Sequence, residues 1–220
     1  MSFAGWPKAA AGWFEGLEAD NSKPYFEARR ATYEDAVRGP LLALLDEVEA
    51  EFGEGKVFRP NRDVRFSADK SPYKTNAAAL IGAAPASYYV SVSADGVMAG
   101  SGMYHMAPDQ LTRYRTAAAD GRKGGQLARV VEGIGRAGYD IAGEQLKTAP
   151  RGVDPNHPRI LLLRHKGLVA MAEWPWDRTS RGAAALERVQ SMWRTTTPLV
   201  DWLNTHVGAA EDPPVRGRRR

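Results

Sequence analysis

The chain has 220 residues, with 30 lysines and arginines against 26 aspartates and glutamates, four histidines and no cysteine. A chain without cysteine has no disulfide, thiolate metal site, iron–sulfur cluster or cysteine nucleophile. The first residues do not resemble a signal peptide, and the longest wholly aliphatic stretch, 160–163, is far too short to span a membrane. We therefore expect a cytoplasmic protein that does not act at a membrane.

The predicted elements begin with helices. A short helix over 8–18 follows Pro7, and apolar residues between 24 and 52 recur at helical spacing. Ser22 is placed to cap this second helix, and Gly39-Pro40 should kink or split it. The pattern then changes to strands over 62–66, 78–82 and 88–94. In the first of these, Val64 and Phe66 would share one face.

The dipeptide Asp95-Gly96 predicts a type I′ hairpin that leads into a strand over 97–104. Helices over 108–120 and 125–136 follow, and the proline-rich stretch 139–159 indicates a long ordered loop. A second hairpin is expected over 160–165 and 168–174, and a final helix over 182–206, kinked at Pro198. The pattern predicts a single α+β domain over 1–208, with a central, mainly antiparallel sheet, flanking helices and long N- and C-terminal helices.

The net charge of +4 is unevenly distributed. Residues 56–74 hold six cations and two acids, and a tail over 209–220, expected to be disordered, carries four arginines. The rest of the chain is therefore mildly acidic. This distribution argues against a general nucleic-acid binder with a broad basic face.

Glycines in the predicted hairpin leave one of its faces bare. Counted outward from the Asp95-Gly96 turn, Tyr89 lies opposite Gly102 and Ser91 opposite Gly100. A glycine inside a strand often marks a place where another group approaches the backbone. That group is either a packing neighbour, such as Tyr89 or a helix, or a bound molecule for which the glycines form the floor.

The most unusual stretch is FRPNRDVRFSADKSPYKT at 58–75, which places five cations and two aspartates beside two prolines and a tyrosine. Arginine binds phosphate or carboxylate through two parallel hydrogen bonds, and lysine adds a point charge. A rigid cationic loop beside a bare sheet face would form an anion pocket. The alternative is a solvated edge strand guarded by charge, with the aspartates as ordinary ion-pair partners.

Several motifs together resemble a family, domain of unknown function 2461. They are FRPNRDVRFSADKSPYKTN (58–76), ADNSKPYFEAR (19–29), SADGVMAGSGMY (93–104), LKTAPRG (146–152) and TPLVDWLN (197–204). The resemblance implies a single-domain bacterial-type protein and brings no established activity with it. It supports a set of candidate site residues: Arg62, Asp63, Arg65, Lys70, Tyr73, Lys74, Gly100, Gly102, Lys147 and Arg151.

Signals for cofactors and metals are weak. The stretch GIGRAG (133–138) follows a helical pattern, and about 20 positions beyond its end stand His157 and Pro158 where a dinucleotide site requires an acidic residue. No two histidines are three or four residues apart, so there is no helical metal pair. We predict neither a cofactor nor a metal.

Three functions remain open. The first is a binding protein for an anionic small molecule, with Arg62, Arg65, Lys70 and Lys74 neutralising the ligand. Tyr73 would stack or donate a hydrogen bond, Gly100 and Gly102 would leave room, and Lys147 and Arg151 would close the far side.

The second function is an enzyme for a phosphoester or acyl substrate at the same place, with Asp63 or Asp69 as base. That role requires one aspartate free of its arginine neighbours. The third is a nucleic-acid or protein interaction module that uses the basic segment and the tail. The sequence does not indicate an oligomeric state.

Overall fold

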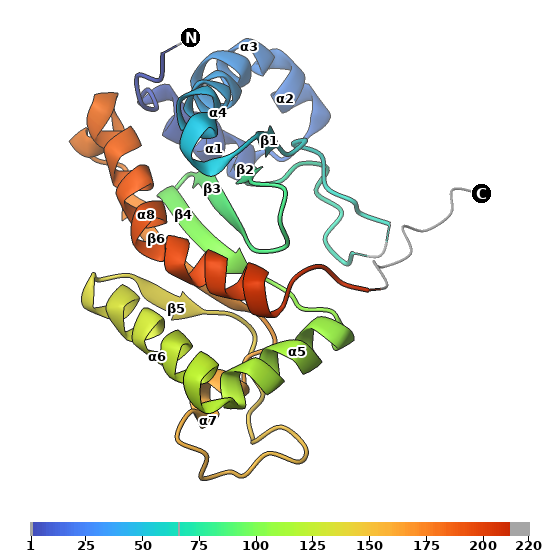
Figure 1. Cartoon of the computed structure of the whole chain (residues 1–220). Coiled ribbons are helices and arrows are strands. Elements are labelled where there is room, and N and C mark those ends of the chain that lie inside the picture. The colour runs from blue at the N-terminus through green and yellow to red at the C-terminus, as the bar shows by residue number, and fades with distance from the viewer. Residues whose placement is uncertain (1, 66, 212–220) are drawn as a thin grey trace. The chain divides into compact units, whose positions relative to one another are not determined.

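The computed structural model describes residues 2–65 and 67–211 (Figure 1). Six strands form one sheet in the order β1-β2-β3-β4-β6-β5, and the pairs β1–β2, β2–β3 and β5–β6 are antiparallel. The strands are β1 (Gly55–Val57), β2 (Asn76–Ile81), β3 (Ser87–Ser93), β4 (Gly96–Met103), β5 (Asp140–Ala142) and β6 (Leu168–Pro175). The predicted α+β fold is confirmed. No described helix is long and apolar enough to cross a membrane.

The described residues group into two compact units. The first comprises 2–65, 67–83, 88–100 and 172–194, and the second comprises 84–87, 101–171 and 195–211. Their helices are α1 (Ala9–Ala19), α2 (Lys23–Ala28), α3 (Arg30–Tyr33), α4 (Gly39–Phe52), α5 (Pro108–Ala119), α6 (Gly121–Arg136), α7 (Ile160–Leu163) and α8 (Gly182–His206).

In the first unit, the predicted helical face over 24–52 becomes a series of helical segments. Ser22 caps α2, since its Oγ accepts a hydrogen bond from the Tyr25 N–H at 3.3 Å. The π-helical turn η1 (Glu34–Arg38) precedes α4, and the Gly39 N–H donates to the Glu34 carbonyl. Pro40 has no N–H to continue the α-helical ladder, so a five-residue repeat carries the chain into α4. The predicted interruption at Gly39-Pro40 is confirmed.

The core of the first unit lies on one face of β2 and β3. Ala77, Ala79 and Ile81 pair with Val92, Val90 and Tyr88 and are buried. Phe52 at the end of α4 meets Tyr88 edge to face, with ring centroids 4.9 Å apart. Helices α1 to α4 gather beside β1 and β2 (Figure 1). Because alternate residues face opposite ways along a strand, the even-numbered residues of β2 are left on the other face.

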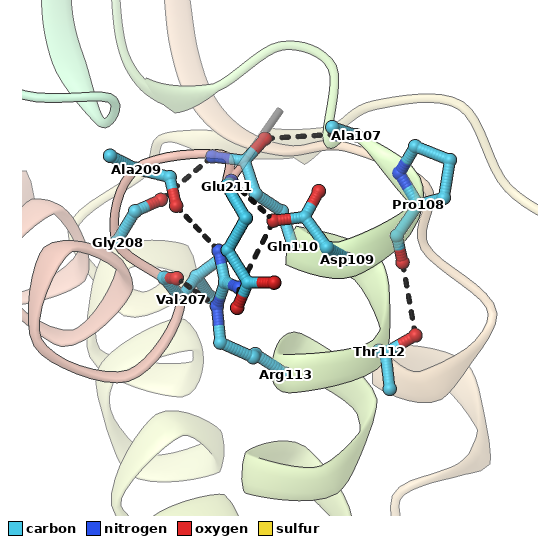
Figure 2. Close-up of polar contacts among 10 residues, drawn as sticks. All are labelled: Ala107, Pro108, Asp109, Gln110, Thr112, Arg113, Val207, Gly208, Ala209 and Glu211. Atoms are coloured by element: carbon cyan, nitrogen blue, oxygen red, sulfur yellow. Dashed lines mark hydrogen bonds and ion pairs between the residues drawn. The ribbon is translucent and has the colours of Figure 1, made fainter. Parts of the chain in front are cut away.

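In the second unit, α5 is joined to the C-terminal segment by polar contacts. The Arg113 guanidinium donates to the Val207 and Ala209 carbonyls, each at 2.6 Å, and forms ion pairs with Asp109 and Glu211 at 3.0 Å (Figure 2). The tail predicted from residue 209 therefore begins with three residues held beside α5. The rest of the predicted tail, residues 212–220, includes its four arginines and lies outside the described residues.

Two predicted strands are wrong. Residues 62–65 form no strand, and Phe66 lies outside the described residues. The run at Ile160–Leu163 is a helical turn, so β6 pairs instead with β5, within the predicted loop. A short apolar run suits a buried helical turn as well as a strand.

The hairpin turn differs from the prediction by one residue. Gly96 is already the first residue of β4, and Ala94 and Asp95 are the two residues between the strands. A Cβ on Gly96 would overlap the Trp174 carbonyl, which explains why glycine starts the strand rather than closing the turn.

Candidate functional site

The basic segment 58–75 forms a loop that is closed at its base by the main chain. The Arg62 N–H donates to the Pro72 carbonyl and the Lys74 N–H to the Pro60 carbonyl, each at 2.9 Å. Pro60 and Pro72, which accept these two hydrogen bonds, restrict the backbone at the closure. This closure accounts for the absence of the predicted strand in the described residues 62–65.

Three of the predicted anion-binding cations are engaged inside this loop. Arg65 forms a two-pronged ion pair with Asp63, with N–O distances of 2.9 and 2.6 Å. Arg62 pairs with Asp69, and the Lys70 ammonium donates to the Val64 carbonyl at 2.9 Å. These contacts stabilise the loop against itself and reduce the charge available to a ligand.

The two aspartates considered as catalytic bases are both engaged. Hydrogen bonds from Arg65 lower the pKa of Asp63 to about 2. Hydrogen bonds from Ser71, and then from Arg62, lower the pKa of Asp69 to about 2. A carboxylate with so low a pKa is a weak base, and neither has the freedom from arginine that the enzyme hypothesis requires.

Tyr73 is part of the core of the first unit. Its side chain is 6% exposed, and its ring stacks on Phe26 with centroids 4.3 Å apart. The Asn21 carboxamide accepts from the Tyr73 N–H and donates to its carbonyl, both at 3.1 Å. Tyr73 therefore anchors the end of the loop, and this position does not allow it to stack on a ligand.

A pocket of about 230 Å³ lies on the sheet face opposite the core. The register explains its composition: Val57 pairs with Ala79, so the next residue, Phe58, stands beside Ala78, and its N–H donates to the Ala78 carbonyl at 2.8 Å. Residues directly opposite in an antiparallel pair share a face. The pocket is lined by Phe58, Arg59, Lys74, Asn76, Ala78 and Tyr89, all from the first unit.

The lining combines two cations with two aromatic rings and an amide, and none of the six residues is acidic. The Lys74 Nζ lies 5.3 Å from the centre of the Phe58 ring, a cation–π contact that holds the ammonium over the hollow. The Asn76 amide donates to the Tyr89 hydroxyl at 3.4 Å. Ala78 adds only a methyl group to the lining.

The two glycines predicted as a floor do not line this pocket. Gly100 is buried. Gly102 has φ +122°, and a Cβ there would overlap the Leu168 carbonyl and stand 3.0 Å from the Val169 Cα. The backbone of β6 therefore occupies the space beside Gly102, which favours packing over a ligand floor at this glycine.

Lys147 and Arg151 are exposed residues of the second unit. The Lys147 carbonyl accepts a hydrogen bond from Arg164 at 2.5 Å, which fixes the backbone of its loop. Among the predicted ligand-binding residues, Lys74 alone lines the pocket of the first unit.

We did not predict from the sequence that the other five lining residues come together at one site. A strand at 55–57 followed by one at 76–81 would have placed alternate residues of both on one face. Instead, the alternation of polar and apolar residues in 62–66 led us to expect a strand within the segment that forms the loop. Within the described residues, no three histidine, aspartate or glutamate side chains are grouped to hold a metal ion.

Comparison with known proteins gives a family and no characterised relative. No curated protein matches the chain. A family model described as Conserved hypothetical protein (DUF2461) matches residues 9–202, which include the loop, the pocket and both hairpin strands. The chain therefore belongs to the DUF2461 family of conserved hypothetical proteins.

Proposed function

We propose that the protein binds a small molecule bearing a phosphate or carboxylate group in the pocket between β1, β2 and β3. The observation that carries this proposal is the pairing of Arg59 and Lys74 at one hollow whose lining contains no acid. The cytoplasmic location and bacterial origin expected from the sequence belong to the same proposal.

The charge that remains available favours this pocket over the loop. Arg62, Arg65 and Lys70 have partners within the loop, whereas no ion pair with a described residue joins Arg59 or Lys74 to an acid. An anion at the pocket would therefore gain two charge-assisted contacts without breaking an existing ion pair. Arginine supplies a planar two-donor edge and lysine a point charge, a combination suited to phosphate or carboxylate.

The expected affinity is modest. A hydrogen bond to a charged group contributes about 1.5–3 kcal/mol, so two such contacts give roughly 3–6 kcal/mol before ordering costs. A simple anion should then bind with a Kd on the order of 1 mM, and more tightly if other parts of it fill the hollow. Binding should weaken as salt is raised, because the site is open to solvent.

Titration calorimetry with inorganic phosphate, sugar phosphates and dicarboxylates at low salt tests the proposal. The Arg59→Ala/Lys74→Ala double variant should lose binding. The matched control is Arg65→Ala/Lys70→Ala, which removes the same charge from the same loop but leaves the pocket lining intact. Equal weakening by both double variants, or no binding of any anion to the wild-type chain, would refute the pocket as the site.

A further inference from the structure

We propose that the anion of this site is a nucleotide, with its base against the aromatic side of the pocket and its phosphate at Arg59 and Lys74. This inference rests on the proposed function and adds the chemical class of the ligand. Charge alone does not explain three of the lining residues, Phe58, Asn76 and Tyr89.

The first observation is an aromatic ring left open to solvent. Phe58 is 38% exposed, although it follows a strand and stands beside the buried Ala78. Tyr89 brings a second ring to the same hollow from β3. Exposed rings on a sheet face provide flat apolar surfaces on which nucleobases stack, and stacking tolerates every base because each has a π-face.

The second observation is an amide positioned to contact the edge of a base. Among the described residues, the Asn76 side chain has one hydrogen bond, from its amide nitrogen to the Tyr89 hydroxyl. A carboxamide has two N–H donors and an acceptor oxygen, so one donor and the acceptor remain for a ligand. This donor–acceptor pair is the group that asparagine offers to the edge of adenine.

The third observation is size. The pocket volume of about 230 Å³ lies below the range of roughly 300–1,000 Å³ typical of sites for drug-sized ligands. One base with one phosphate group suits a hollow of this size better than a dinucleotide does. The same face continues past the pocket through Lys56 and Leu80, which pair with each other across β1 and β2. A nucleotide within a single strand of nucleic acid is therefore a second source of the same chemistry.

The test compares AMP with ribose 5-phosphate, which carries the same phosphate without the base. Stacking one base on an aromatic ring corresponds to about 5- to 150-fold in affinity, so AMP should bind more tightly than ribose 5-phosphate by that factor. Phe58→Ala should remove most of the difference, and Phe58→Tyr should keep it. Leu80→Ala is the matched control, because Leu80 is equally exposed on the same face and does not line the pocket.

The outcomes separate this inference from the proposed function. Equal affinities for AMP and ribose 5-phosphate would overturn the nucleotide and leave the anion site standing, as would a Phe58→Ala variant with an unchanged preference. If neither compound bound, both proposals would fall. The last arm uses an oligoadenylate that has its internal phosphodiesters but no terminal phosphate. If it binds more tightly than AMP, and Phe58→Ala weakens that binding, the result would support the inference and identify nucleic acid as the source.

Discussion

Replacing Gly102 with alanine should destabilise the protein strongly, since this glycine meets two separate constraints. Its φ of +122° lies in a region that residues with a side chain rarely adopt, at a cost of about 1–3 kcal/mol. The added Cβ would also overlap the Leu168 carbonyl and crowd the Val169 Cα at 3.0 Å. Both neighbours are backbone atoms of β6, so relief requires the strand itself to shift, which adds about 1–3 kcal/mol.

The two terms predict a loss of about 2–6 kcal/mol in the free energy of unfolding, measured by urea denaturation. For a chain of this size, the midpoint of thermal unfolding should fall by about 4–24 °C. Gly133→Ala is the matched control: Gly133 lies inside α6, and a Cβ there meets nothing within 4 Å. That variant should gain about 0.5–1 kcal/mol, because alanine is the better helix former.

A Gly102→Ala variant within 0.5 kcal/mol of the wild-type chain would contradict this reasoning. It would mean that β6 does not lie against Gly102 and that the space beside this glycine is open. The ligand floor expected from the sequence would then regain support at this position.

Two further predictions concern the second unit. Arg113→Ala should lower the free energy of unfolding by about 1–3 kcal/mol and speed amide hydrogen exchange in 207–211, because it removes hydrogen bonds to the Val207 and Ala209 carbonyls. The control is Arg136→Ala: Arg136 is exposed and forms an ion pair only with Glu132 on the same helix, α6, so its loss should change the free energy of unfolding by about 0.5 kcal/mol or less. Equal effects of the two variants would refute a role for Arg113 in holding residues 207–211. Burial lowers the pKa of His165, so the unfolded chain takes up a proton that the folded chain resists, and stability should fall as the pH drops below about 6.5. His165→Gln should flatten that fall in urea denaturation at pH 7.5 and 5.5, and an unchanged slope would show that His165 does not cause it.

The helices were predictable because their signals are local. The Ser22 cap, the break at Gly39-Pro40 and the periodic apolar face of 182–206 depend on neighbours within a few residues. The bounds of α1, α5 and α8 lie within about two residues of the prediction, as expected where one capping or proline signal fixes each start.

Strand pairing was harder to predict because it depends on distant residues. The alternation in 62–66 resembles a strand, but Asp63 and Arg65 pair with each other, and Arg62 closes the loop on Pro72. Nothing within that stretch shows that its hydrogen-bonding partner lies ten residues further on. β1 has three residues, too few for periodicity to reveal.

The candidate site was likewise predictable where the signal is local and unpredictable where it depends on distant residues. The concentration of charge at 58–75 is visible in the sequence, and Lys74 lines the pocket as predicted. Which cations stay available depends on where each acid lies, and only the structure shows that Asp63 and Asp69 engage Arg65 and Arg62. The pocket instead includes Arg59, which a composition-based argument cannot distinguish from its neighbours.

An NMR titration of the labelled protein with inorganic phosphate at low salt would locate the bound anion and so decide whether it occupies the pocket. We expect chemical-shift changes concentrated on the Asn76 side-chain amide, the Lys74 ammonium and the backbone amides of Phe58 and Ala78. Shifts confined to residues 62–72, with the amides of β2 unmoved, would place the anion on the loop and refute the pocket as its binding site.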